Sequence, residues 1–110
     1  MEIKDSKFYR DKCYINGEWV NAVSGETISV NNPANLKEIG TVPKCGTSET
    51  RNAIEAANNA WPEWRAKSAR QRSEILRKWF DLMIENKEEL AQIMTVEQGK
   101  PINESRGEIG

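Results

Sequence analysis

The spacing of hydrophobic positions along the chain changes near Thr47. Before this residue, short runs alternate between apolar and polar side chains, as expected for half-buried strands. After it, apolar side chains recur every three or four positions, as expected for amphipathic helices. We therefore predict an α+β fold, with short antiparallel strands over residues 13–46 and three to four helices over residues 47–110. No β-α-β unit is complete in this order, so these residues alone do not argue for a parallel sheet.

The strand region is marked by turn residues. Cys13–Val20 predicts a hairpin, because Asn16 and Gly17 at its centre tolerate the positive φ angles of a two-residue turn. Two further strands are expected at Thr27–Val30 and Glu38–Val42, each bounded by turn or proline residues. The polar residues before the hairpin predict a loose N-terminal arm.

Thr47 or Ser48 is the expected N-cap of the first helix, because either side chain can cap a helix N-terminus. Pro62 should end or kink this helix after Trp61, since proline lacks the N–H that a helix interior uses. Its predicted apolar face contains Ala53, Ala57, Ala60, Trp61 and Trp64. We expect the tryptophans to pack in a core rather than to stack on a ligand.

Two capping boxes predict where the next helices start. Ser68 with Gln71 marks the start of a second helix, and Asn86 with Glu89 marks the start of a third. The predicted apolar stripe of the second helix contains Ile75, Leu76, Trp79, Leu82 and Met83, and that of the third contains Leu90, Ile93 and Met94.

A glycine and a proline separate the third helix from the last one. Gly99 can adopt the left-handed conformation that ends a helix, and Pro101 cannot continue one. Proline does suit the first turn of a helix, so a fourth helix is expected over Ile102–Glu108.

Composition excludes several classes of function. The chain is 37% hydrophobic and 30% charged with a net charge of −1, so we expect neither nucleic acid nor an anionic membrane as a partner. Its apolar runs are too short to span a membrane, and its charged N-terminus does not resemble a signal peptide, which predicts a cytoplasmic location. The absence of histidine excludes Ser-His-Asp, Cys-His and histidine-ligated metal sites within this chain.

The two cysteines, Cys13 and Cys45, are the obvious candidates for a nucleophile, and we interpret both as structural or incidental. Neither belongs to a C-x-x-C pattern, and the chain offers no histidine to activate a thiol. In a reducing cytosol both should be free thiols, and a disulfide between them is the less favoured alternative. We therefore assign no catalytic, cofactor-binding or metal-binding residue from the sequence.

Charged residues cluster on the predicted helices. A basic group comprises Arg65, Lys67, Arg70, Arg72, Arg77 and Lys78. Acidic residues lie among and behind these, so we interpret the group as a solvated face, with a subunit interface and nucleic-acid binding as weaker alternatives. Glu104 and Glu108 would share one face of the last helix, where Lys100 and Arg106 favour a surface ion network over a paired-carboxylate site.

Several segments in order resemble the N-terminal part of the aldehyde dehydrogenase family. They are YINGEWV, NPA at Asn32–Ala34, EIGTVPKCG, AIEAANNAWPEWRAKSARQRSEILRKW, LMIENKEELAQIMTVEQGKP and ESRGEIG. Together they cover almost the whole chain from about Cys13, and their order and spacing make the resemblance specific. Within the family, WPEWRAKSARQR and IMTVEQGKPINESRGEI are most similar to succinate-semialdehyde dehydrogenases.

This resemblance implies that residues 1–110 are the incomplete N-terminal part of a Rossmann-like α/β cofactor-binding domain. The family oxidises small aldehydes to acids with NAD or NADP, using a cysteine nucleophile, a glutamate-activated water and an oxyanion site. All these groups belong to later parts of the family chain, and none maps onto Met1–Gly110. The resemblance therefore implies an inactive fragment, with no cofactor expected on the fragment itself, of an enzyme that oxidises succinate semialdehyde to succinate when whole.

A non-enzymatic module is the alternative hypothesis. Helices that normally cover a sheet would expose apolar faces in isolation, so the helical face from Leu76 to Met94 could bind a second copy or another partner. We therefore predict a homo-oligomer whose interface buries Trp61, Trp79 and Met83.

Overall fold

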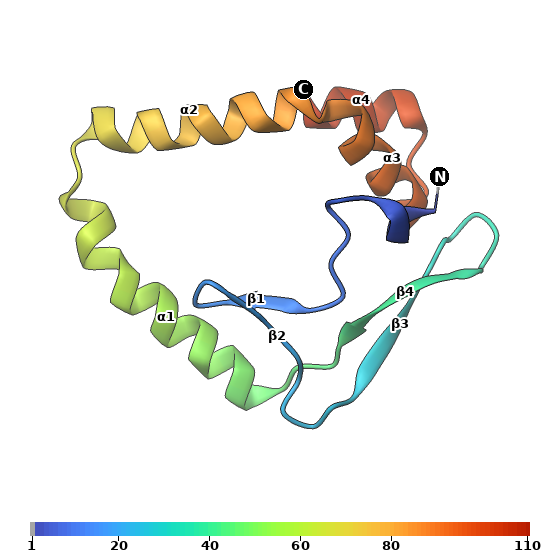
Figure 1. Ribbon diagram of the computed structural model, residues 1–110, viewed down its shortest axis with the longest axis horizontal. Helices are drawn as coiled ribbons and strands as arrows, with labels where there is room; N and C mark the ends of the chain where they lie inside the picture. Colours follow the sequence, from blue (N-terminus) through green and yellow to red (C-terminus); the bar gives the residue numbers. More distant parts are fainter. Residues whose placement is uncertain (1) are drawn as a thin grey trace. The chain divides into compact units, whose positions relative to one another are not determined.

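The computed structural model describes residues 2–110, and it has the predicted α+β order (Figure 1). A short 3-10 helix (Ile3–Asp5) comes first and is followed by β1 (Cys13–Ile15), β2 (Glu18–Val20), β3 (Thr27–Asn31) and β4 (Glu38–Pro43). The helices are α1 (Thr47–Ala66), α2 (Ala69–Glu85), α3 (Lys87–Gln98) and α4 (Ile102–Ile109). Strands 1 and 2 form one two-stranded sheet, and strands 3 and 4 form another.

The chain divides into two compact units. One unit contains the N-terminal residues up to Tyr9 together with Ser29–Gly40 and Ile75–Gly110. The other contains Arg10–Ile28 and Thr41–Glu74. Within the described residues the buried hydrophobic side chains are few and mostly small: Ile3, Ala22 and Ala91. Each unit therefore has a small core of its own.

The predicted hairpin is confirmed. β1 and β2 pair antiparallel with Tyr14 opposite Trp19, and the two rings lie 5.1 Å apart between centroids. Asn16 and Gly17 have φ angles of 53° and 79°, the left-handed pair that a tight hairpin turn requires. The turn residues and the aromatic pair across the strands thus specify the same register.

The start of α1 differs from the prediction by one residue. Gly46, rather than Thr47 or Ser48, occupies the N-cap position, and no side-chain hydroxyl caps the helix. The Glu49 carboxylate instead accepts a hydrogen bond from the backbone N–H of Gly46. A glutamate at the third helical position that accepts from the N-cap N–H forms one half of a capping box, and its negative charge suits the helix N-terminus.

Pro62 was predicted to end or kink the helix, and the first of these alternatives is wrong. The helix continues through Pro62 to Ala66 and closes with a hydrogen bond of 3.2 Å from the Lys67 N–H to the Trp64 carbonyl. Proline removes one hydrogen bond to the preceding turn, but its φ angle is helical and the long helix on its N-terminal side remains intact. One missing bond near the end of a 20-residue helix is therefore tolerated.

The predicted capping box that starts α2 is confirmed, and the one that starts α3 is wrong. Ser68 Oγ accepts from the Gln71 N–H at 3.2 Å, and Gln71 Oε1 accepts from the Ser68 N–H at 2.9 Å. The Asn86 side chain instead donates to the Leu82 carbonyl, closing the preceding helix. Glu89 is used elsewhere, because it accepts a hydrogen bond from Ser6 Oγ.

That contact also corrects the prediction of a loose N-terminal arm. Ile3 and Ser6 are buried, and the bond from Ser6 to Glu89 ties the arm to α3. A buried isoleucine and a hydrogen bond to a helix order a segment whose local sequence is too polar to predict it.

The helices α3 and α4 pack against one another around a sharp corner. Gly99 ends α3 with a φ angle of 80°, and α4 begins directly after Pro101, as predicted. Ala91 of α3 and Ser105 of α4 are both 0% exposed. The corner is the best-buried part of its unit.

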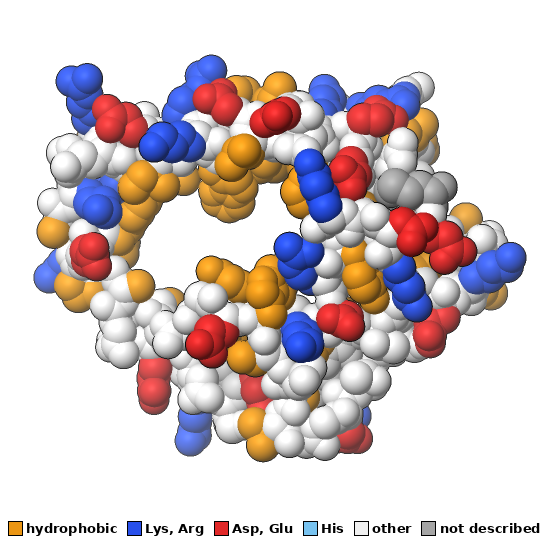
Figure 2. All heavy atoms as spheres, viewed as in Figure 1, with side chains coloured by type: hydrophobic (Ala, Val, Ile, Leu, Met, Phe, Trp, Pro, Cys, Tyr) orange, Lys and Arg blue, Asp and Glu red, His pale blue; other side chains and the backbone are white. Residues whose placement is uncertain are grey.

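The predicted apolar stripe of α2 forms, but it is not covered. No residue of α2 is buried, and Trp79 is 64% exposed, Leu82 58% and Leu76 51%. Figure 2 shows hydrophobic side chains gathered along one side of this helix. None of the helices in residues 2–110 combines the length and hydropathy needed to cross a bilayer.

Candidate functional site

The corner between α3 and α4 carries a buried polar pair. Thr95 Oγ1 and Ser105 Oγ lie 2.8 Å apart within hydrogen-bond distance. Because Ser105 is 0% exposed, this bond satisfies a hydroxyl that has no access to water. The pair therefore fixes the register of the two helices rather than offering a group to a ligand.

Two ion pairs border the same corner. Arg106 donates from Nε and Nη2 to the two carboxylate oxygens of Glu88, both at 2.8 Å. These bonds, with a smaller contribution from Gln92, lower the pKa of Glu88 to about 2. Lys100 pairs with Glu108, and this bond raises the pKa of Lys100. The predicted pairing of Lys100 with Glu108 is thus present, whereas Arg106 pairs with Glu88 of α3 instead of with a carboxylate of its own helix.

Glu49 is a buried carboxylate at the start of α1. It accepts hydrogen bonds from the backbone N–H of Gly46, from the backbone N–H of Val23 at 3.0 Å and from Ser48 Oγ at 3.0 Å. These bonds, the Gly46 bond first, hold the pKa of Glu49 below its usual value. The sequence prediction missed this residue, because its partner Val23 lies 26 positions away.

Neither carboxylate suits general acid–base chemistry. A general acid or base works best when its pKa lies near the operating pH. The pKa of Glu88 is about 2 and that of Glu49 is lowered, so both are held as anions at neutral pH. Their geometry indicates that they organise the backbone and the helix corner.

We expect the stability of the chain to fall in acid through Glu49 and Glu88. A pKa lowered by folding adds stability above the unfolded value, and this stability is lost as pH falls through the folded value. For Glu88 the window runs from its ordinary 4.5 down to about 2. Urea unfolding followed by circular dichroism between neutral pH and pH 2 should show midpoints that decrease across this window.

A matched pair of variants separates the contribution of Glu88. Arg106→Gln removes the partner of Glu88, so the urea midpoint should depend less on pH below 4.5. Lys78→Gln removes one exposed cation from α2 and serves as the control. We expect its urea midpoint to depend on pH in the same way as that of the parent chain. If the urea midpoints of the two variants depended equally on pH, the ion pair of Arg106 with Glu88 would not be the source of the acid sensitivity.

The two cysteines meet, although they lie 32 residues apart in sequence. The Sγ atoms of Cys13 and Cys45 are 3.6 Å apart, and both thiols are free. Partial burial, the neighbouring Cys13 and the nearby Glu49 all raise the pKa of Cys45. A raised pKa lowers the thiolate population, which opposes a role for Cys45 as a nucleophile. Among residues 2–110, no group of three potential ligands from Cys, Asp and Glu is placed to hold a metal.

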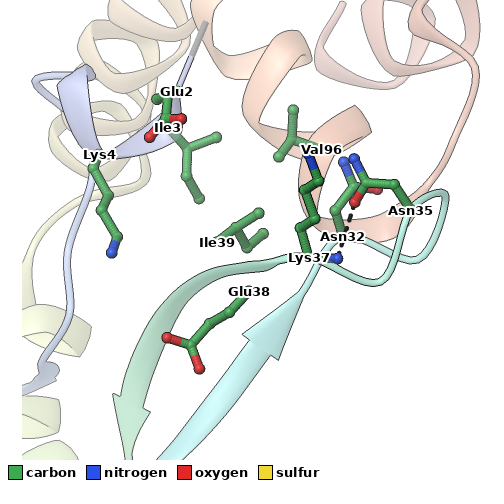
Figure 3. A pocket seen from close by; sticks show the side chains of 9 residues that line it. All are labelled: Glu2, Ile3, Lys4, Asn32, Asn35, Lys37, Glu38, Ile39 and Val96. Carbon is green, nitrogen blue, oxygen red and sulfur yellow. Dashed lines mark hydrogen bonds between the residues drawn. The ribbon is translucent and has the colours of Figure 1, made fainter.

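A cavity of about 300 Å³ lies beside the β3–β4 turn (Figure 3). Ile3 and Ile39 point toward one another across it, whereas Lys4 and Glu38 extend away. Asn32 Oδ1 accepts from the Ala34 N–H at 2.9 Å, so this amide oxygen is already used to hold the turn. The cavity is lined by Glu2, Ile3, Lys4, Asn32, Asn35, Lys37, Glu38, Ile39 and Val96. We assign no cofactor to this cavity.

The members of the basic group that lie on α2 are partly neutralised along the helix, whereas Arg65 belongs to α1 and Lys67 lies between the two helices. Arg70 pairs with Glu74 at 3.2 Å and Arg77 with Asp81 at 3.1 Å, each four residues apart. Arg77 also lies over the Phe80 ring, 4.9 Å from its centroid. These contacts support the interpretation as a solvated face, since the paired arginines present less uncompensated charge to a nucleic acid.

The model of the aldehyde dehydrogenase family matches residues 19–110. The chain belongs to this family. It is 59% identical to the glutarate-semialdehyde dehydrogenase of Pseudomonas putida KT2440 and 54% identical to the NADP(+) succinate-semialdehyde dehydrogenase of Escherichia coli K12, in each case over 99% of the chain. The resemblance seen in the sequence is therefore confirmed.

Solved structures of aldehyde dehydrogenases share the fold of this chain. The succinate-semialdehyde dehydrogenase of Burkholderia pseudomallei matches 96% of the chain with a TM-score of 0.92 and 53% sequence identity. The match spans 22% of that structure's chain, and the two curated relatives above are covered to 23% of their length. The chain thus spans about a quarter of the length of these relatives and corresponds to an N-terminal portion of the aldehyde dehydrogenase fold.

Proposed function

We propose that this chain is the N-terminal part of an NAD(P)-dependent dehydrogenase that oxidises the semialdehyde of a dicarboxylic acid to the corresponding diacid. The substrate that we propose is succinate semialdehyde. The observation that carries the proposal is identity of 54–59% over 99% of the chain to relatives named for succinate and glutarate semialdehydes. Glutarate semialdehyde is the longer homologue by one methylene, so it is the natural competing substrate. We further propose a cytoplasmic location.

The role we propose for the residues described here is architectural. The α3–α4 corner is held by the Thr95–Ser105 bond and by the pair of Glu88 with Arg106. The exposed apolar side of α2 provides a surface onto which further parts of a dehydrogenase would pack. The nicotinamide cofactor accepts the hydride in this family, and we assign no residue of 1–110 to its binding. Residues 1–110 alone are expected to be inactive.

The test is an assay of the complete reading frame that contains these residues. Reduced-cofactor formation is measured with succinate semialdehyde, glutarate semialdehyde and butyraldehyde, each with NAD and with NADP. We expect kcat/KM for the better dicarboxylic semialdehyde to exceed that for butyraldehyde by at least about 10-fold, because a site that pairs a carboxylate rejects an analogue without one. A higher kcat/KM for butyraldehyde would contradict the proposal. A higher kcat/KM for glutarate semialdehyde than for succinate semialdehyde would mean that glutarate semialdehyde is the substrate.

Self-association through α2 is the second candidate function. The observation that favours it is the uncovered row of Ile75, Leu76, Trp79 and Leu82, which are 45–64% exposed. A contiguous apolar row at helical spacing is energetically costly in water and is covered when two copies associate.

Trp79→Glu should weaken this association. Tryptophan at the centre of an interface contributes more than most residues, so we expect the dissociation constant from sedimentation equilibrium to rise at least about 10-fold. Lys78→Glu introduces the same residue on the charged side of α2 and should leave the constant within about 3-fold. Equal effects of the two substitutions, or a parent chain that stays monomeric at high concentration, would argue against the interface.

A further inference from the structure

The cysteine pair lies at a fixed junction of strand and helix. Cys13 is the first residue of β1 and pairs with Val20 in the hairpin. Cys45 lies in the short link between β4 and α1. The helix α1 also contacts β1, so the two elements that flank the cysteines pack together.

Backbone hydrogen bonds hold the residues on both sides of Cys45. The Lys44 N–H donates to the Glu26 carbonyl at 2.8 Å, and the Gly46 N–H donates to the Glu49 carboxylate. These two bonds hold the backbone immediately before and after Cys45. The backbone is held by hydrogen bonds at Cys13 in the hairpin and next to Cys45, so the fold itself places the two sulfurs in contact.

The distance between the sulfurs favours a covalent bond over a metal. The Sγ atoms are 3.6 Å apart, which is van der Waals contact, and a disulfide requires about 2.05 Å. A structural metal would need further ligands, and no third Cys, Asp or Glu completes such a group among residues 2–110.

We propose that Cys13 and Cys45 form a redox modification site, in which a hydroperoxide converts the two thiols to an intrachain disulfide and a dithiol reductant restores them. The pair is separate from the proposed dehydrogenase activity, because it involves no residue that we assign to that reaction. The reduced form is the resting state in a reducing compartment.

The chemistry proceeds in two steps. One thiolate attacks the hydroperoxide, so that an S–O bond forms, the O–O bond breaks, and the departing oxygen leaves as water or an alcohol after protonation. The second sulfur then attacks the sulfenic acid, so that the S–S bond forms, the S–O bond breaks, and water leaves. Two thiols are oxidised by two electrons in total, and one hydroperoxide is reduced. The raised pKa of Cys45 disfavours it as the attacking thiolate, so we expect Cys45 to act as the resolving sulfur.

The experiment compares this chain with its Cys13→Ser and Cys45→Ser variants after treatment with hydrogen peroxide at low protein concentration. For the parent chain we expect titratable thiols to fall from two to near zero, with an intact mass lower by two hydrogens. Protease digestion without reductant should release one cross-linked pair of peptides that contain Cys13 and Cys45. Dithiothreitol should restore both thiols, and the oxidised chain should show a higher urea midpoint.

Three results would overturn the proposal. The first is covalent dimers in place of the intrachain product. The second is sulfinic acid on either cysteine with no cross-link. The third is that both thiols of the folded chain remain titratable after a peroxide treatment that oxidises the thiols of the urea-unfolded chain. The serine variants should lack the intrachain product while keeping the circular dichroism spectrum of the parent, which shows that the fold itself does not depend on the bond.

Discussion

Replacing Ala91 with aspartate is expected to unfold the α3–α4 corner. Ala91 is 0% exposed, and it lies four residues before Thr95, so both share the face of α3 that contacts α4. An aspartate there would bury a charge without a partner, at a cost of about 3–5 kcal/mol. That is a large part of the roughly 5–15 kcal/mol by which a domain is stable, so the urea midpoint should fall well below that of the parent chain.

The control for this prediction is Glu97→Asp in the same helix. Glu97 is exposed, so the substitution keeps the charge and tests only the lower helix propensity of aspartate, which costs less than about 1 kcal/mol. If Ala91→Asp and Glu97→Asp lowered stability equally, burial at Ala91 would not be what stabilises the corner. The soluble yield of Ala91→Asp should fall as well, because the unpacked helices expose apolar surface.

The sequence predicted the elements whose signals are local. Asn16-Gly17 marked the hairpin turn, Ser68 with Gln71 marked the start of α2, and Gly99 with Pro101 marked the α3–α4 corner. Each of these signals depends on residues within one turn of structure, where backbone preferences decide the conformation. The family resemblance could be recognised for the same reason, since most of its segments are these helices and turns.

The features that the sequence did not predict depend on distant partners. Glu89 looked like part of a capping box, but it accepts a bond from Ser6, which is 83 residues away. Glu49 accepts from Val23, and the cysteines meet across the hairpin and the start of α1. A local pattern cannot show such contacts, because they exist only after the fold brings the partners together. The prediction that the first helix would end at Pro62 was wrong for a different reason. Proline disfavours a helix interior, yet α1 continues through Pro62 to Ala66.

Replacing Gly99 with alanine is expected to destabilise the chain by about 2–5 kcal/mol in urea unfolding. Gly99 has a φ angle of 80°, which costs an alanine about 1–2 kcal/mol. A Cβ at this position would also lie 2.8 Å from Pro33 Cγ, so the β3–β4 turn or the helix corner would have to move. Overpacking of this kind typically adds about 1–3 kcal/mol.

Two further variants divide this cost between the backbone and the contact. Gly17→Ala is the matched control, because Gly17 has a φ angle of 79° and its added Cβ would meet nothing within 4 Å, so it should lose only about 1–2 kcal/mol. Pro33→Ala removes the Cγ atom that the new methyl group would strike. The double variant should therefore be more stable than the sum of the two single losses predicts, with a coupling of about 1–2 kcal/mol. Additive losses would mean that the strain at Gly99 lies in the backbone alone, and that the turn after β3 moves aside without cost.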